Sequence, residues 1–409
     1  MKTIKEKTIS IYCTADLHSN IPTSVNLLEE LIRKKGEKTL LIDLGDFSEG
    51  SPFYNLFSGL PENKIINKIY NIIIPGNHDF EDILNINKTK SDVKIINANI
   101  YKSGKLVFKP NIIINKLGYK FGFISIISPG AFNAIEIDKR KNFTAIDPCK
   151  ILRKEILKLK DRVDFLFLLS HSGMEYDKIL AEKFKEFDAI FSSHCHSRYK
   201  QKFVNKTLIV KPPENGKGLI ELLISDKNKI KYNIKTTPNG NELFKMPELL
   251  FLNSYLKKYY KTLNKKLFSI NKSFCLKFTN RKLLADYIIH KLQKFYQADI
   301  YLINYSCLRD IFRPGRFTLE KLYRIMPFDN YLVTFKIDYS NYKKIICGLD
   351  DEIKKFFCIN KYNSKLLKNE EIKILTTSYL FHNIFNRDSN LKCKKEILLR
   401  DFIGEKIIK

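Results

Sequence analysis

Residues 72–80 read Ile-Ile-Ile-Pro-Gly-Asn-His-Asp-Phe, and the rest of the chain can be interpreted outward from this stretch. Three consecutive isoleucines are typical of a buried strand, and a Pro-Gly pair ends the strand in a turn. Asn77, His78 and Asp79 follow in successive positions. An amide oxygen can bind a metal, an imidazole can bind metal or donate a proton, and a carboxylate can orient the imidazole. Turn chemistry alone would also explain Pro-Gly-Asn, so a polar turn and a functional site both fit this stretch.

Other apolar segments in the first half end in the same way. A strand at 7–15 ends at Asp16-Leu17-His18, and a strand at 39–44 ends at Gly45-Asp46. Helical spacing of apolar residues at 24–35, and a helix-like stretch to about residue 68, separate the three strands. Alternating strands and helices predict a parallel α/β sheet, in which all strands place their carboxyl ends at one edge.

The next segment repeats this arrangement with shorter elements. A strand at 163–169 ends at Ser170-His171, and a short strand at 189–191 leads to His194 and His196. A charged helix at about 148–160 precedes them. Further strands are predicted near 93–97, 111–115, 120–127, 207–211, 219–224 and 229–235.

A cluster of breaking residues at 236–241 marks a candidate linker. Beyond it, 247–267 is predicted to be one long amphipathic helix, and a second domain contains a helix at 281–295 and a strand at 299–304. The predicted domains are residues 1–236, a linker and helix over 237–268, and residues 269–409.

The chain has 409 residues, 44% hydrophobic and 12% aromatic, which suits packed globular domains. Its formal charge is +28, and the lysines are spread over almost every segment, so we expect no specific nucleic-acid partner. The positive electrostatic potential of the protein should still attract anionic substrates. The first residues contain charges throughout and no apolar signal-peptide core, and no apolar run approaches the length of a membrane span. These features predict a cytoplasmic protein without a membrane partner; the oligomeric state stays open.

Five of the seven histidines fall at predicted strand ends in the first half of the chain. Together with the neighbouring Asp and Asn residues, these histidines offer more nitrogen and oxygen ligands than the roughly four that one Zn²⁺ ion binds. Such a set suits two ions about 3.5–4 Å apart that share a carboxylate. The candidate ligands are Asp16, His18, Asp46, Asn77, His171, His194 and His196.

These motifs, Asp-x-His, Gly-Asp, Gly-Asn-His-Asp, a lone His and His-x-His, resemble those of the calcineurin-like metallophosphoesterases. Their order and the second domain are most similar to the bacterial 5′-nucleotidase branch. The resemblance implies an α/β fold: a four-layer α/β/β/α sandwich, joined by a long helix to a smaller α+β domain. One departure is Ser193, where the family usually has Gly.

The resemblance also implies roles for the ligands. Asp16, His18, Asp46 and His196 would hold a first divalent ion, and Asp46, Asn77, His171 and His194 a second, with Asp46 as the bridge. Asp, Asn and His together accept Zn, Mn or Fe. His78 would stabilise charge on the transferred phosphoryl group and protonate the leaving oxygen, with Asp79 orienting it.

In the second domain, residues 299–309 and 325–330 are similar to substrate-binding segments of the family. The match implies that Asn304 and Arg309 contact a nucleotide and that Phe328 stacks on its base. A core phenylalanine and a surface arginine are the alternative. Ser306 and Cys307 replace two family glycines, Arg281-Lys282 stands where Gly-Asn is expected, and Tyr379 or Phe385 would have to supply the second stacking aromatic.

The leading hypothesis is a two-metal hydrolase of phosphate esters, with nucleotide 5′-monophosphates as substrates. A 2′,3′-cyclic nucleotide phosphodiesterase, or a phosphatase for another small ester, uses the same type of metal centre. A hypothesis of another class is a non-catalytic, metal-containing protein that binds an anionic partner. The intact His78-Asp79 pair argues against it, because a pure binding protein does not require that pair.

Overall fold

The structure of the chain is a computed structural model. It describes residues 8–407 except 90, 197–200, 226–229, 239–242, 328, 350–356, 362–370 and 387–390. The chain divides into two compact units, residues 1–259 and 260–409. Each unit has its own sheets and core, and each is described by itself.

The first unit contains a six-stranded sheet in which β1 is central. β1 pairs with β2 in parallel and with β14 antiparallel, and β3 and β4 continue the parallel part. The strand order is β15-β14-β1-β2-β3-β4. The bounds are β1 (Ile9–Thr14), β2 (Thr39–Asp43), β3 (Ile72–Ile73), β4 (Lys94–Ile95), β14 (Gly218–Ile224) and β15 (Ile230–Thr236).

A second six-stranded sheet faces the first. Its four inner strands are parallel and its two edge strands are antiparallel. The order is β12-β13-β11-β10-β8-β7. The bounds are β7 (Asn111–Lys116), β8 (Tyr119–Ile127), β10 (Phe165–His171), β11 (Ala189–Ser192), β12 (Gln201–Val204) and β13 (Thr207–Val210).

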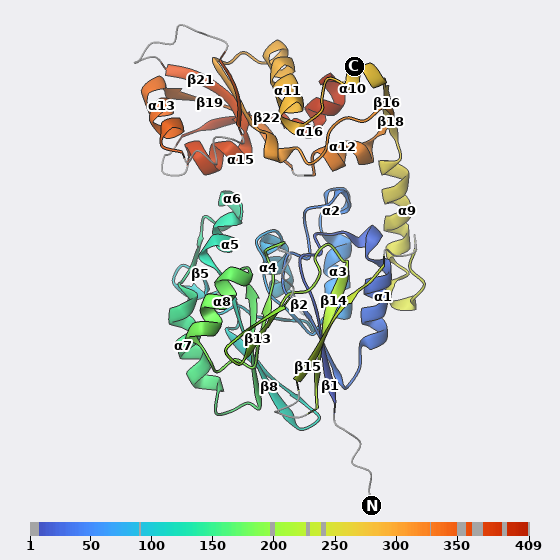
Figure 1. Cartoon of the computed structure of the whole chain (residues 1–409), viewed down its shortest axis with the longest axis vertical. Helices are drawn as coiled ribbons and strands as arrows, with labels where there is room; N and C mark the ends of the chain where they lie inside the picture. Colours follow the sequence, from blue (N-terminus) through green and yellow to red (C-terminus); the bar gives the residue numbers. More distant parts are fainter. Residues whose placement is uncertain are drawn as a thin grey trace, which may run out of the picture. The chain divides into compact units, whose positions relative to one another are not determined.

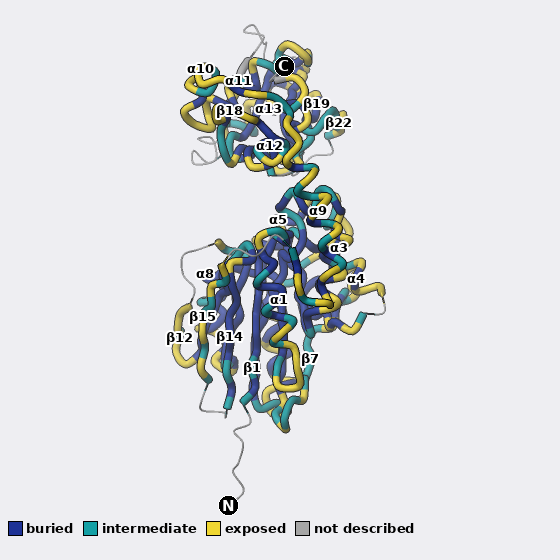
Figure 2. Tube along the Cα trace, turned by 90° about the vertical axis from the view of Figure 1, so that its right-hand side faces the viewer, coloured by how far each residue is buried: buried dark blue, intermediate teal, exposed yellow. Residues whose placement is uncertain are grey.

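The alternation of side chains along β10 builds two cores. Phe165 and Phe167 point toward the first sheet, where they join a buried cluster with Ile11 and Ile42. Leu166 and the strand residue two positions after it point the other way and pack against helices. Because successive side chains of a strand face opposite sides, one uninterrupted apolar run supplies both interfaces. Figure 2 shows the buried residues concentrated along the strands of this unit.

Helices cover the outer faces of both sheets, so the unit has four layers (Figure 1). On one side lie α1 (Val25–Lys34) and α3 (Leu60–Ile69), and on the other α7 (Pro148–Leu159) and α8 (Met174–Lys183). This arrangement confirms the predicted α/β/β/α sandwich. The remaining helices are α2 (Pro52–Phe57), α4 (Phe80–Lys88), α5 (Pro129–Ala134) and α6 (Ile137–Arg140), and a small sheet contains β5 (Ile100–Lys102), β6 (Lys105–Leu106) and β9 (Phe143–Ala145).

The second unit is α+β, as predicted. A five-stranded sheet of order β20-β17-β21-β19-β22 has α11 (Arg281–Phe295) on one face and α13 (Tyr339–Cys347) on the other. The Asn280 side chain caps α11 by accepting a hydrogen bond from the Leu283 amide at 3.0 Å. The strands are β17 (Ile300–Asn304), β19 (Tyr331–Asp338), β20 (Phe357–Lys361), β21 (Glu371–Thr377) and β22 (Cys393–Leu398). Smaller elements are β16 (Lys266–Ile270), β18 (Gly315–Thr318), α10 (Lys272–Cys275), α12 (Leu319–Ile325), α15 (Ser378–Leu380) and α16 (Leu399–Phe402).

The helix predicted over 247–267 is shorter in the structure. It begins with a separate turn at Pro247–Leu249, and α9 itself spans Leu252–Leu263. It ends there because residues 266–270 pair with β18 instead. Two predicted features, Phe328 and the linker residues 239–241, lie outside the described residues. Among the described helices, none combines the length and the apolar character that a membrane span needs.

Candidate functional site

The predicted metal ligands all lie in the first unit, and they come from both central sheets. Each follows or ends a strand at the carboxyl edge of its sheet. Asp16 and His18 follow β1, Asp46 follows β2, Asn77 follows β3, His171 ends β10, and His194 and His196 follow β11. Since the two sheets are packed face to face, segments far apart in sequence deliver their side chains to one place.

Ligand atoms of these residues lie close enough to share ions. Within each of three groups, one ligand atom per residue lies within 4.8 Å of the others. Asp46 belongs to two of these groups, one of which also contains His78, a residue predicted not to bind metal. The groups are Asp16–His18–His196, His18–Asp46–His78, and Asp46–His171–His194.

The first ligand group presents two imidazole nitrogens to one point. His18 Nε2 lies 3.4 Å from His196 Nε2. Burial lowers the pKa of His18 to about 4, so its imidazole is neutral near pH 7 and has a lone pair for a metal. The other ring nitrogen of His18, Nδ1, is buried without a hydrogen-bond partner among the described residues.

The second group surrounds Asp46. His171 Nε2 lies 3.3 Å from Asp46 Oδ2 and 3.2 Å from Asn77 Oδ1. His171 Nδ1 lies 2.8 Å from the Leu44 carbonyl oxygen, which can only accept, so Nδ1 carries the proton. The His194 amide donates to Asp16 Oδ1 at 3.1 Å and so connects the two groups.

The charge of the cluster fits divalent cations. Asp16, Asp46 and Asp79 are almost completely buried. Burial raises the pKa of Asp16 to about 7. Burial acts to lower the pKa of His171, but the Asp46 carboxylate acts against it, and the pKa of His171 rises to about 10. Without metal, protons on these groups therefore offset the negative charge of the buried carboxylates. Bound divalent cations would replace the protons. Imidazole nitrogens, an amide oxygen and carboxylates together form a donor set that suits Zn, Mn or Fe.

The backbone is strained at four of the predicted ligands. Asp16, His18, Asp46 and His194 have φ angles of +50°, +50°, +55° and +77°. The left-handed region costs an L-residue roughly 1–2 kcal/mol, so it persists where the surroundings impose it. Strain concentrated on one cluster of polar side chains is typical of a functional site.

Two glycines allow the loops after β2 and β3 to touch. A Cβ at Gly45 would lie 2.7 Å from the Gly76 nitrogen, and a Cβ at Gly76 would lie 2.4 Å from the Asp46 nitrogen. Both distances are too short for any side chain. The glycines therefore place Asp46 and Asn77 side by side.

Asp79, predicted to orient His78, makes its described hydrogen bonds to the backbone. One Asp79 carboxylate oxygen accepts from the Phe47 amide and the other from the Gly76 amide, both at 2.8 Å. Asp79 thus connects the same two loops that the glycines bring into contact, and its role toward His78 stays a prediction.

His78 lies at the edge of the cluster, and its acidic partner is a residue that the sequence analysis missed. His78 Nδ1 lies 3.8 Å from Glu49 Oε2. Burial alone would lower the pKa of His78, but the Asp46 and Glu49 carboxylates raise it above its usual value. The only sequence signal for Glu49 is its place in the loop after Asp46.

Lys211 is a second residue that the sequence analysis missed. It is fully buried after β13 and pairs with Glu214 at 2.8 Å. Its charge acts to lower the pKa of Asp16, against the larger effect of burial. One lysine among 72 basic residues carries no signal in the sequence.

The predicted substrate residues belong to the second unit. The Asn304 side chain is buried; it donates to Ser306 Oγ at 3.0 Å and accepts from Thr377 Oγ1 at 3.3 Å, which connects the ends of β17 and β21. Arg309 is exposed, and its amide donates to the Ile325 carbonyl. Of the two candidates for a second stacking aromatic, Phe385 is buried in the core and Tyr379 is 54% exposed.

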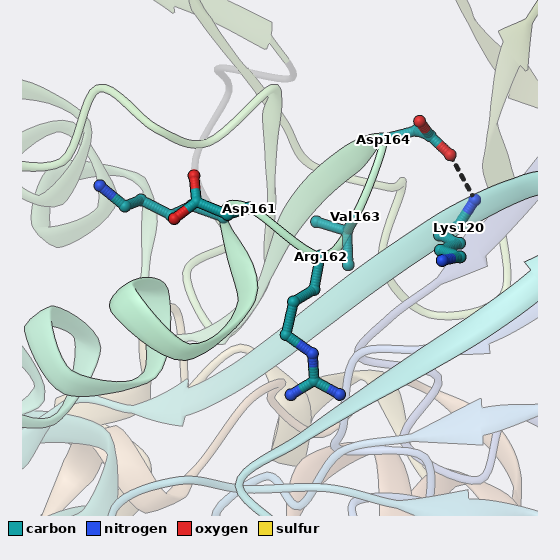
Figure 3. Close-up of a pocket in the computed structure, with 6 residues that line it drawn as sticks. Lys120, Asp161, Arg162, Val163 and Asp164 are labelled. Carbon is teal, nitrogen blue, oxygen red and sulfur yellow. Dashed lines mark hydrogen bonds between the residues drawn. The ribbon is translucent and has the colours of Figure 1, made fainter.

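A separate open pocket of about 390 Å³ lies in the first unit, lined by Lys120 and residues 160–164 (Figure 3). These residues are at the beginnings of β8 and β10, whereas His171 is at the end of β10. The pocket therefore lies at the opposite end of the sheet from the ligand cluster and contains none of the predicted site residues.

We predict that Gly76→Ala weakens metal binding about 10- to 100-fold, because the added methyl group forces the loop away from Asp46. Titration calorimetry with Mn²⁺ measures the affinity. Gly36→Ala is the matched control, since a Cβ at Gly36 meets nothing within 4 Å. Unchanged affinity in Gly76→Ala would show that the contact between the loops does not set the ligand geometry.

Comparison with known proteins supports these observations. Residues 9–198 match the family described as "Calcineurin-like phosphoesterase". The chain is 26% identical over 189 residues to an apyrase of Tabanus yao, a match that covers 44% of this chain and 33% of that protein. It is 24% identical over 351 residues to the uncharacterized metallophosphoesterase YunD of Bacillus subtilis, covering 79% and 74% of the two chains.

The solved structures include a putative 5′-nucleotidase of Staphylococcus aureus, with a TM-score of 0.75, 16% identity and 98% of both chains covered. The match spans about a third of the length of several curated relatives, including the apyrase and the 5′-nucleotidase of Mus musculus. Residues 9–198 therefore match a calcineurin-like phosphoesterase domain, and the fold of the chain is similar to that of the putative 5′-nucleotidase of Staphylococcus aureus.

Proposed function

We propose that this protein is a metal-dependent hydrolase of phosphate esters with two divalent ions. The observation that supports this most directly is the position of Asp46, which belongs to ligand groups on both sides and accepts from the His78 amide at 2.8 Å. Two ions held close together would stabilise both the attacking and the leaving oxygen in phosphoryl transfer. The family to which the domain belongs supports the same reaction class.

Asp16, His18, Asp46 and His196 would hold one ion, and Asp46, Asn77, His171 and His194 the other. When bound, the ions would lower the pKa of the attacking water and neutralise charge on the phosphoryl oxygens. His78, which the resemblance assigns to neither ion, would stabilise the developing charge and supply a proton to the leaving oxygen. Asp79 would keep the two ligand loops together.

Nucleotide 5′-monophosphates are the substrates that we propose first. Several curated relatives are named 5′-nucleotidases, and an exposed guanidinium at Arg309 suits a nucleotide. Another small phosphate ester, or a 2′,3′-cyclic nucleotide, is the second candidate. Two buried residues favour this second candidate. Cys307 occupies a position where the resemblance leads us to expect glycine, and Phe385 is a candidate for stacking on a base.

We expect the protein loaded with Mn²⁺ or Zn²⁺ to hydrolyse p-nitrophenyl phosphate, and removal of the metal by a chelator to abolish turnover. Metal content is measured by elemental analysis beside the activity assay. Protein that holds two ions per chain and turns over with neither metal would identify a non-catalytic binding protein. A panel of nucleotides, cyclic nucleotides and sugar phosphates then identifies the substrate class.

His78→Ala should leave both ions bound and lower kcat about 100-fold or more, as expected for loss of a general acid. Asn77→Ala should instead weaken one ion, because the amide oxygen is a ligand. Metal content and kcat are measured for both variants. Loss of metal in His78→Ala would mean that His78 is itself a ligand.

Arg309→Ala should raise KM for a nucleotide about tenfold and leave KM for p-nitrophenyl phosphate nearly unchanged. The small aryl ester has no nucleoside for the second unit to bind. Arg313→Ala is a suitable control, because Arg313 is also exposed and pairs with the nearby Asp310 at 3.1 Å. Equal effects on both substrates would argue that the second unit does not bind the nucleotide.

A further inference from the structure

The loop that follows Asp46 brings a carboxylate to His78. Glu49 Oε2 lies 3.8 Å from His78 Nδ1, and Glu49 Oε1 lies 2.5 Å from the Lys139 Nζ. Each oxygen therefore faces a different basic group. The three side chains come from the β2–α2 loop, the β3–α4 loop and helix α6, so the fold brings them together from separate segments.

The backbone conformation of this loop is costly. Glu49 has a φ of +56°, and Gly50 follows with a φ of +97°. A Cβ at Gly50 would lie 3.1 Å from His18 Nδ1, so the backbone after Glu49 packs directly on the ring of a predicted metal ligand. A glutamate in the left-handed region is uncommon, and such strain persists where the surroundings hold it. Here the strained turn directs the carboxylate toward His78.

The His78 ring needs a partner that the rest of its motif does not supply. Its amide is fixed by Asp46, and its ring meets the His18 ring edge to face, with centroids 5.0 Å apart. Asp79 uses both of its oxygens on backbone amides. Of the acidic side chains described here, Glu49 is the one that pairs with His78 through Nδ1.

We propose that Glu49 is a positioning residue for His78, and that Lys139 in turn holds Glu49. The inference rests on the proposed phosphoester hydrolysis. The Glu49 carboxylate lies beside the Nδ1 edge of the ring, at 3.8 Å, and this contact leaves Nε2 to face the phosphoryl group.

The step that depends on this pair is cleavage of the ester bond. Water forms the new P–O bond, the bond to the leaving oxygen breaks, and the proton on His78 Nε2 passes to that oxygen. The proton released by the attacking water then returns to His78 Nε2. The products are an alcohol and inorganic phosphate, so atoms and charge balance. An alkoxide needs this proton to leave, whereas p-nitrophenolate leaves without it.

Glu49→Gln keeps the shape of the side chain and removes its charge. We expect kcat for glycerol phosphate to fall about tenfold or more with KM little changed, and kcat for p-nitrophenyl phosphate to fall less than about threefold. Metal content should stay at the wild-type value. Glu136→Gln is the matched control, because Glu136 also pairs with Lys139, at 3.6 Å, and is 70% exposed. Equal losses for both esters would overturn the proposal.

A double-mutant cycle tests whether Glu49 acts through His78. In the His78→Ala background, Glu49→Gln should cause no further loss of turnover, since the residue that it positions is absent. Additive losses would show that Glu49 acts on the metals or on the substrate directly, and the positioning role would be wrong.

The contact can also be tested without catalysis. Nitrogen-15 NMR of the histidine rings reports which nitrogen of His78 carries a proton. We expect Nδ1 to be protonated in the wild-type protein and the tautomer distribution to change in Glu49→Ala; an unchanged distribution would overturn the proposal. If metal-loaded wild-type protein hydrolyses no ester, the proposed function fails, and this measurement still decides whether Glu49 orients the ring.

Discussion

The contact between the backbones of Gly45 and Gly76 is the constraint on which the candidate site depends. It brings the ends of β2 and β3 closer together than any other residue pair would permit at these positions. Asp79 then secures the contact by accepting from an amide of each loop. Asp46 and Asn77 receive their positions from this arrangement. Asp16 and His18 follow β1 of the same sheet, whereas His171 and His194 approach Asp46 from the facing sheet. Hydrogen bonds and backbone sterics thus set the ligand geometry.

The electrostatics of the cluster explain why such a constraint is needed. Buried carboxylates repel one another and lose their hydration, so they would move apart if the loops were free. His171 and Lys211 provide some compensation from within the protein. The left-handed conformations at Asp16, His18, Asp46 and His194 add further cost. The two large apolar cores beneath the site supply the stability that keeps these residues in place.

Much of the first unit could be predicted because its signals are local. Apolar runs that end in Asp, Asn or His specify both the parallel strands and the edge at which the polar residues gather. The roles of Asp79 and Glu49 depend on contacts with loops distant in sequence, and no local pattern reveals such contacts. The same holds for Asn304, whose amide connects two strand ends of the second unit. The long helix was overestimated because its amphipathic pattern continues into residues that pair with β18.

Ser193 precedes the predicted ligand His194, and its hydroxyl donates to the Leu44 carbonyl at 2.7 Å. The same carbonyl accepts from His171 Nδ1, so one backbone oxygen of the first sheet receives two groups from the second. These bonds join the two halves of the sandwich directly behind the ligands and do not involve a cation. These two bonds therefore hold His171 and the residue before His194 against the first sheet through protein atoms.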